Sequence, residues 1–268
     1  MARLAELDTA TARSWIDRWD RQQEVYLADR EERFTALIDA VETAAGRPDP
    51  LVIDLGCGPG SLAVRLLDRL PAATVVAVDA DPVTLALGRA AYAGRPGLRF
   101  ADVDLRAPGW ESGLGLEPGQ PADAVISTTA LHWLTGPELH ALYRALGALL
   151  RRGGLLLNGD HLRLDQGSAP RLAGIERALE EREALRRFPD GHADRADDWA
   201  QWWQAATADP ALTAAAAERA RRGLGASDHD QADGVLLDTH VSALRAAGFA
   251  EAGTIWQRGG NRLLCAVR

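Results

Sequence analysis

The chain has 268 residues, 47% of them hydrophobic, and a formal net charge of −8 at pH 7. This length and hydrophobic content suit one large domain, or one domain with a sizeable insertion. The acidic balance argues against an extended nucleic-acid surface, and no apolar run approaches the length of a membrane span.

The cysteines and the N-terminus give little sign of special chemistry or targeting. Neither a disulfide framework nor a metal cluster follows from two cysteines, Cys57 and Cys265, so we predict no metal. The N-terminal segment is charged and has no apolar signal core, which predicts a cytoplasmic protein.

Residues 1–45 carry apolar side chains at helical spacing, and Gly46, Pro48 and Pro50 end that region. We therefore predict an N-terminal helical cap over residues 1–48. Within it, Tyr26 and Arg30 lie four residues apart on one face, where they could close a ligand pocket. A packed or solvent-facing helix is the alternative.

Residues 51–60 are the most informative segment of the chain. An apolar strand over 51–55 runs into a loop with Gly56, Gly58 and Gly60, and a helical pattern follows over 61–70. Glycine admits left-handed backbone angles and lets a ligand approach the main chain. Open α/β sheets bind nucleotides at such strand-to-helix turns, although many tight turns need glycine for geometry alone.

Strand and helix patterns then alternate, which indicates parallel strands with helices on both faces of a sheet. Strand-like runs occur at 51–55, 74–79, 98–101, 122–127 and 153–158, and helical patterns at 61–70, 82–91 and 137–150. The alternation stops over 162–236, where a charged, alanine-rich helical insertion is expected. A helix over 238–247 and two strands, 253–258 and 261–267, joined by a glycine turn, follow it.

Acids follow two of the strands. Asp79 ends the second strand, where a carboxylate can accept both hydroxyl protons of a ribose. Capping of the next helix is the alternative role, but it suits Asp81 better because Pro82 fits the first helical position. Asp102 follows the third strand; it could accept the exocyclic amine of an adenine, or be an ordinary surface acid.

Five segments, in order and spacing, resemble the class I S-adenosylmethionine (SAM)-dependent methyltransferases. They are residues 52–60, 78–79, 101–103, 123–127 and 150–154, and Ala247-Gly248-Phe249 fits the last helix-to-strand turn of that family. The resemblance implies an α/β, Rossmann-like, seven-stranded and mostly parallel sheet with an antiparallel last strand. It also implies a SAM-binding core over 49–161 and 237–268, with the helical insertion 162–236 as a lid.

The resemblance further implies a role for each matching residue, with SAM as the cofactor. The glycine loop would cradle the methionine end, Asp54 would position the amino group or its water, Asp79 would hold the ribose, and Asp102 with Val103 would read the adenine. The full set of expected cofactor contacts is Asp54, Gly56, Cys57, Gly58, Gly60, Asp79, Ala80, Asp102, Val103, Thr128, Tyr26 and Arg30. A dinucleotide dehydrogenase would carry its third glycine at Ser61, which argues against that class.

The loop after the fourth strand carries the first candidates for chemistry. His132 could act as a base or hydrogen-bond donor, and Trp133 could offer its ring to a cation or a substrate. Packing under the loop is the alternative for both. The string Ala130–Leu134 resembles methyltransferases acting on small carboxylic acids, such as trans-aconitate and malonyl-thioester enzymes.

Two further groups are candidates. Asp160 and His161 end the fifth strand, where neighbouring side chains point to opposite faces, so at most one faces the pocket; we favour His161 as a second catalytic residue. Trp199, Trp202 and Trp203 form one aromatic helical face. Such a face is more often core than ligand site, yet a lid would let Trp199 and Trp203 contact the substrate.

We therefore expect a SAM-dependent methyltransferase that acts on a small molecule, with a carboxylate or hydroxyl oxygen favoured as acceptor, for example of a secondary metabolite. We expect a monomer or homodimer with no nucleic-acid or membrane partner. Two alternatives stay open, a tRNA- or RNA-modifying enzyme and a SAM-binding protein without catalysis, because binding motifs and chemistry are separable.

Overall fold

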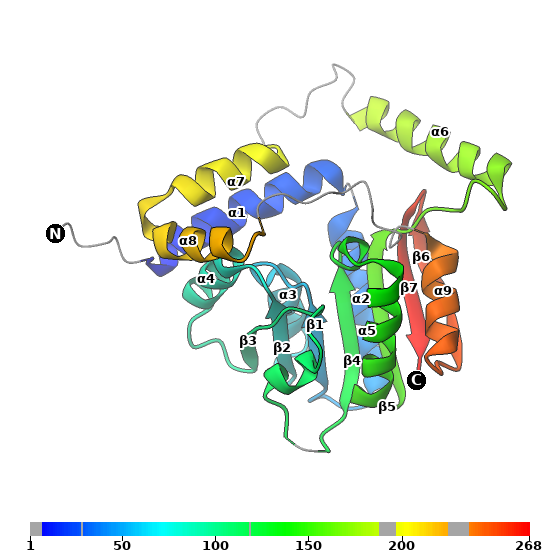
Figure 1. Ribbon diagram of the computed structural model, residues 1–268, viewed down its shortest axis with the longest axis horizontal. Coiled ribbons are helices and arrows are strands. Elements are labelled where there is room, and N and C mark those ends of the chain that lie inside the picture. The colour runs from blue at the N-terminus through cyan, green and yellow to red at the C-terminus, as the bar shows by residue number, and fades with distance from the viewer. Residues whose placement is uncertain (1–6, 28, 118, 188–196, 225–235) are drawn as a thin grey trace.

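The computed structural model describes residues 7–27, 29–117, 119–187, 197–224 and 236–268. Within these residues one sheet has the strand order β3-β2-β1-β4-β5-β7-β6 (Figure 1). The strands are β1 (Leu51–Leu55), β2 (Thr74–Asp79), β3 (Leu98–Asp102), β4 (Ala122–Thr128), β5 (Leu150–His161), β6 (Glu251–Arg258) and β7 (Asn261–Val267). Strands β1 to β5 pair in parallel, and β7 is antiparallel to both of its neighbours. The predicted fold class is confirmed.

Strand β5 is longer than the predicted 153–158 because it is paired on both sides. It runs parallel to β4 and antiparallel to β7, and the pairing with β7 continues to its last residue, His161. The inner strands β1 and β4 are almost completely buried, as their continuous apolar sequences indicate for a sheet covered on both faces.

Helices cover the two faces of the sheet with separate apolar clusters (Figure 1). Helices α2 (Arg30–Ala45), α3 (Ser61–Arg69) and α4 (Pro82–Ala91) contribute to one face, and α5 (Gly136–Leu149) and α9 (Leu237–Ala246) to the other. Asp81 caps α4 by accepting from the amides of Val83 and Thr84. This capping role agrees with the prediction from Asp81-Pro82.

A third cluster lies beyond the sheet, between α1 (Thr9–Tyr26), α4 and α7 (Trp199–Ala208). Helix α8 (Thr213–Arg221) packs against α4 and α7, after the short 3-10 helix η3 (Pro210–Leu212). The two other short helices are η1 (Trp110–Leu114) and η2 (Leu131–Trp133). Helix α6 (Pro170–Arg187) lies apart from α7 and α8, near the β6–β7 end of the sheet (Figure 1).

Candidate functional site

A cavity of about 910 Å³ opens beside the carboxyl ends of the central strands. Its wall combines the glycine loop after β1, the loops after β2 and β3, the loop after β4, and residues of α1, α2, α7 and α8. The predicted site residues in this wall are Arg30, Gly56, Cys57, Gly58, Asp79, Ala80, Val103, Thr128, Trp133, Trp199 and Trp203. The cavity wall does not include Asp54, Gly60, Asp102, His132 or His161.

The glycine loop needs its glycines for backbone angle and for space. Gly56, Gly58 and Gly60 have φ values of 65°, 54° and 92°, in the left-handed region. A Cβ on Gly56 would lie 2.3 Å from the Cβ of Ala130. The loop after β4 is therefore pressed directly onto the glycine loop. At the same contact Thr129 adopts a φ of 49°, a strained value for a β-branched residue.

Asp54 is the buried carboxylate expected to serve the amino group of SAM. It is fully buried, and no side chain among the described residues donates to either oxygen; the backbone amide of Ala63 faces it and opposes the rise in its pKa. Burial, and then the nearby Asp79 carboxylate, raise the pKa of Asp54 well above its usual range. A buried carboxylate without partners is costly unless a ligand or water serves it, so Asp54 fits a cationic amino group close by.

Asp79 is held in place by the loops on either side of it. Its carboxylate accepts from the backbone amides of Gly58 at 2.7 Å and Asp81 at 2.9 Å. Burial raises the pKa of Asp79 to about 6, although these hydrogen bonds oppose the shift. Each carboxylate oxygen has a second lone pair, so a fixed Asp79 at the cavity wall can still accept hydroxyl protons.

Arg30 brings a buried cation to the cavity wall. Its side chain is 5% exposed, and Nη2 donates to Asp20 at 3.0 Å. Nη1 has no hydrogen-bond partner among the described residues, and lies 3.7 Å from Glu31. Arg30 thus has a donor to offer a carboxylate, as the methionine end of SAM would require. The side chain of Tyr26 lies outside the described part of the chain.

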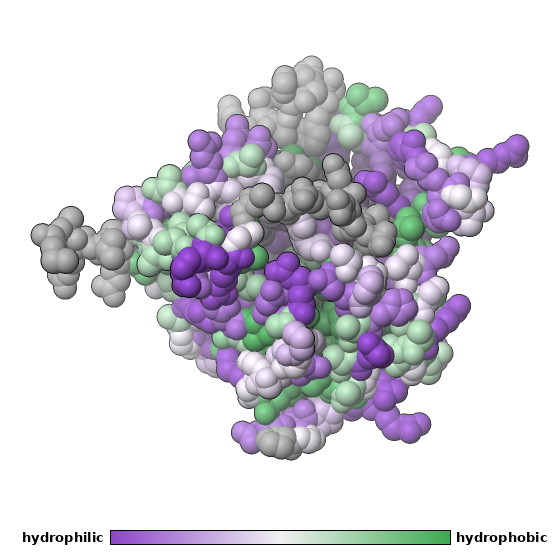
Figure 2. Space-filling model, in the orientation of Figure 1, coloured by the Kyte–Doolittle hydropathy of each residue, from purple (hydrophilic) through white to green (hydrophobic). Residues whose placement is uncertain are grey.

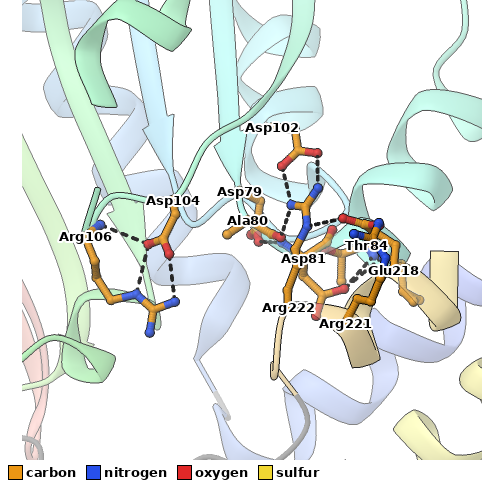
Figure 3. A network of polar contacts seen from close by, with 11 residues as sticks. Asp79, Ala80, Asp81, Thr84, Asp102, Asp104, Arg106, Glu218, Arg221 and Arg222 are labelled. Atoms are coloured by element: carbon orange, nitrogen blue, oxygen red, sulfur yellow. Dashed lines mark hydrogen bonds and ion pairs between the residues drawn. The ribbon is translucent and has the colours of Figure 1, made fainter. Parts of the chain in front are cut away.

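Asp102 takes a different position from the one its expected adenine contact requires. Its carboxylate is turned to α8, where Arg222 donates to both oxygens at 2.6 and 2.9 Å (Figure 3). The side chain of Val103 does line the cavity, but its amide donates to the carbonyl of Asp79 at 2.9 Å. The adenine role of Asp102 and Val103 stays a prediction.

Asp160, the penultimate residue of β5, pairs with His132 and not with the side chain of its neighbour His161. His132 Nδ1 lies 2.9 and 3.0 Å from the Asp160 oxygens, while His161 offers Asp160 only its backbone amide, at 2.8 Å. Side chains alternate along β5, so Asp160 faces η2 and His161 does not. Neither His161 nor Asp160 belongs to the cavity wall, and the catalytic role of His161 stays a prediction.

The charge state of this pair follows from burial and from mutual attraction. Burial by itself lowers the pKa of His132, but the Asp160 carboxylate outweighs it, and the net pKa is raised. Burial by itself raises the pKa of Asp160, but His132 and then Arg33 outweigh it and lower the pKa. The pair is therefore held as imidazolium and carboxylate to a higher pH than an isolated histidine.

Arg33 is a site residue that the sequence analysis did not find. It is fully buried on α2 and donates to Thr128 Oγ1 at 2.5 Å and to Asn261 Oδ1 at 2.6 Å. Burial lowers the pKa of Arg33 to about 10. A Cβ on Gly159 would lie 2.9 Å from Arg33 Nε, so glycine gives the guanidinium its room. The available signal was an arginine directly before Phe34, on the apolar face of the helix.

The aromatic face of α7 is divided between core and cavity. Trp202 is fully buried in the third cluster, whereas Trp199 and Trp203 are half-buried and line the cavity. The Arg219 guanidinium lies 3.8 Å from the centre of a Trp203 ring. Trp202 is therefore a core residue, and contact of Trp199 and Trp203 with the substrate stays a prediction.

The described residues contain no cluster of three or more His, Cys, Asp or Glu side chains arranged to hold a metal ion. In the same residues, none of the helices combines the length and apolarity that a bilayer crossing requires.

Comparison with known proteins gives a family match over part of the chain. Residues 52–154 match the family model described as "Methyltransferase domain". The chain is 35% identical over 138 residues to trans-aconitate 2-methyltransferase of Azoarcus sp. (strain BH72), covering 52% of this chain and 49% of that one. It is 30% identical over 137 residues to the enzyme of the same name from Escherichia coli, covering 51% and 49%. The chain thus spans about half the length of the curated relatives it matches.

Solved structures share the fold over a longer stretch. An O-methyltransferase family protein from Burkholderia thailandensis aligns with a TM-score of 0.54 and 18% identity, covering 94% of this chain and 68% of that chain. The apo form of the SAM-dependent methyltransferase SibL aligns with a TM-score of 0.50 and 16% identity, covering 82% and 50%. At these identities the likeness concerns the fold alone.

Proposed function

We propose, from the premise that this chain has a class I SAM-dependent methyltransferase core, that it transfers the methyl group of SAM to an oxygen atom of a small molecule. The observation that carries the proposal is the single cavity wall shared by the glycine loop, Asp79, Arg30 and the loop before His132. The methyl donor SAM and the methyl acceptor would then bind next to each other in the same cavity.

The residues present fit SAM at three points. The Gly56–Gly60 loop leaves bare main chain beside the cavity, Arg30 has a donor for a carboxylate, and Asp54, buried behind the cavity wall, would act on the amino group through a water. Asp79 would accept the ribose hydroxyls, and the side chain of Val103 would contact the adenine. When bound, SAM supplies a methyl group on a positively charged sulfur, and a nucleophile displaces it in line.

His132 would handle the proton if the acceptor is a hydroxyl. Asp160 holds Nδ1 of His132, which assigns proton exchange to Nε2, and the flanking Leu131 and Trp133 line the cavity. In its neutral form, which is populated above its raised pKa, His132 would take the hydroxyl proton at Nε2 as the oxygen bonds to the methyl carbon. A carboxylate acceptor carries no proton and would need only positioning.

A small carboxylic acid or hydroxyl compound is the acceptor class that we propose. Two relatives are named for trans-aconitate, which makes this tricarboxylate the first probe. Helices α1 and α7, outside residues 52–154, also contribute to the cavity wall, and α7 carries Trp199 and Trp203. We propose that residues 1–48 and 162–236 form a cap and lid that set specificity, over a core of 49–161 and 237–268, in a monomer or homodimer.

Calorimetry with S-adenosylhomocysteine (SAH) tests the cofactor site. Hydrogen bonds to a charged group contribute about 1.5–3 kcal/mol, so Asp79→Asn should weaken binding by roughly 10- to 100-fold. Asp39→Asn, on the exposed side of α2, is the matched control and should bind like the wild type. Equal affinity of the wild type and Asp79→Asn would refute the ribose role.

Transfer of a radiolabelled methyl group tests the activity. Purified protein is incubated with labelled SAM and trans-aconitate, and in parallel with a small-molecule fraction and with tRNA. Label in a small molecule supports the proposal. Label in tRNA would favour an RNA modifier, and SAH binding without any transfer would favour a non-catalytic SAM-binding protein.

A further inference from the structure

Helix α8 is tied by arginines to the sheet edge that carries the expected adenosine contacts. Arg219 Nε donates to Asp81 Oδ2 at 2.6 Å. Arg222 donates to both oxygens of Asp102, at 2.6 and 2.9 Å, and to the carbonyl of Ala80, also at 2.9 Å (Figure 3). We call the contacts of Arg222 with Asp102 and Ala80 the α8 clasp.

The α8 clasp stands at the rim of the cavity. Ala80, Arg219, Gly223 and Leu224 line the cavity, so the end of α8 and the residues after it cover its β2–β3 side. Asp102 is absent from the wall although its neighbour Val103 belongs to it. The Asp102 carboxylate is thus directed to Arg222 and away from the cavity.

Both groups expected to read an adenine are already engaged within the chain. Arg222 occupies the two oxygens of Asp102, and the amide of Val103 donates to Asp79. The two hydrogen bonds with Arg222 hold the Asp102 carboxylate outside the cavity wall, where an exocyclic amine in the cavity would not meet it. Asp102 cannot keep this geometry and also turn into the cavity.

We propose that Arg222 and the adenosine end of the cofactor compete for Asp102, so that the α8 clasp must open for the cofactor to bind fully. This inference rests on the proposed function, because it takes the β2–β3 side of the cavity as the adenosine end. The α8 clasp, which the helical insertion supplies, then lowers the affinity of the protein for the cofactor.

The exposure of the clasp suits reversible opening. The side chains of Arg222 and Asp102 are 33% and 35% exposed, and hydrophilic side chains gather on part of the surface over α8 (Figure 2). Ion pairs this close to solvent are weak and screened by salt. The competition is therefore expected to lower affinity severalfold, and to fade as ionic strength rises.

Calorimetric titration with SAH tests the proposal, using Arg222→Met and a matched control, Arg221→Met. SAH lacks the sulfonium charge of SAM, so its binding depends less on the net charge of the site. Arg221 is 76% exposed and pairs with Glu218 of its own helix, so Arg221→Met removes the same charge without touching Asp102. Arg222→Met should bind SAH about three- to tenfold more tightly than the wild type, and Arg221→Met like the wild type.

Ionic strength gives an independent reading of the same competition. At about 1 M salt the Debye length falls to roughly 3 Å, and the α8 clasp should weaken. Salt also screens the contacts with the charged methionine end of SAH, so wild-type affinity should rise relative to that of Arg222→Met as the salt concentration increases. Asp102→Asn, which loses both the clasp and the acceptor, should bind more weakly than Arg222→Met.

The outcomes separate this inference from the proposed function. Binding to the wild type that is not tightened by Arg222→Met, or that weakens in the variant, overturns the clasp and leaves the cofactor site standing. Tightening by Arg221→Met to the same degree also overturns it, as a mere charge effect. Absence of SAH binding to the wild type and to both variants would instead overturn the proposed function.

Discussion

At the scale of single residues, the pair His132–Asp160 shows that the fold decides which acid and which histidine form an ion pair. The residue types at the ends of β4 and β5 indicated proton chemistry at this edge of the sheet. Asp160 and His161 are neighbours at the end of β5 and face opposite sides of the strand. Asp160 faces η2, so its side chain pairs with His132. A fully buried carboxylate beside a half-buried imidazole then sets the charge of both.

Replacement of Asp160 by Asn tests this coupling. Without the carboxylate, burial and the Arg33 charge remain, and both lower the pKa of His132. We expect NMR titration of the His132 ring, assigned with His132→Gln, to show a lower pKa in Asp160→Asn than in the wild type. An equal or higher pKa would contradict the pairing.

The pH dependence of stability follows from the same shifts. The raised pKa of His132 means that its contribution to stability is full below about pH 6.5 and is lost as pH rises through the raised value. The lowered pKa of Asp160 keeps its own contribution until pH falls through that value. Wild-type protein should therefore gain stability over Asp160→Asn in mildly acidic solution, as urea unfolding at two pH values can measure.

Gly56 should be intolerant of any side chain. Gly56→Ala places a Cβ 2.3 Å from that of Ala130 and forces alanine to a φ of 65°, whereas Gly94→Ala has a φ of 74° and no atom within 4 Å. Left-handed strain of about 1 kcal/mol is common to both, so an additional loss of about 1–3 kcal/mol in Gly56→Ala measures the contact with the loop after β4. Equal unfolding free energies for the two variants would contradict that contact.

At the scale of elements, α6 shows what a charged helix pattern leaves open. Most side chains of this charged helix are exposed. Two of its glutamates are directed at the β6–β7 hairpin, where Glu176 accepts from Arg262 at 2.5 Å and Glu180 accepts from the Gly260 amide at 2.8 Å. The side chains of Arg262 and Glu176 are 3% and 9% exposed, so this ion pair is buried.

Removal of one charge from this pair should cost much stability. Glu176→Gln leaves the buried Arg262 guanidinium without its counter-charge, and such a loss typically destabilises by about 3–5 kcal/mol. Glu181→Gln, on the exposed side of the same helix, should change the unfolding free energy by less than about 0.5 kcal/mol. Chemical denaturation of both variants measures the difference, and a small loss in Glu176→Gln would show that α6 is not anchored there.

At the scale of the whole molecule, the cavity is shared by elements from distant parts of the chain. Residues of α1, α2, α7 and α8 face the loops of the sheet across it. A ligand bound only by this assembled wall should stabilise the folded state as a whole. At a concentration of about 100 times its Kd, SAH should add about 2.7 kcal/mol to the free energy of unfolding.

A thermal melt with and without SAH checks this expectation. The melting temperature of the wild type should rise with SAH concentration, and that of Asp79→Asn should rise much less at the same concentrations. An SAH-independent melting temperature would contradict a cofactor site in the folded protein. Adenosine serves as the control, because it lacks the methionine end that the glycine loop and Arg30 would hold.

Local patterns in the sequence determined the strands, the order of the core helices, the glycine loop and the position of Asp79. These features depend on apolar periodicity, on glycine at left-handed angles and on strand ends, all of which act between residues close in sequence. Only the tertiary structure decided the pairs Arg33–Thr128, His132–Asp160 and Arg222–Asp102. Each joins segments far apart in the chain, and the choice among many charged partners is made by which side chains packing brings within hydrogen-bond reach.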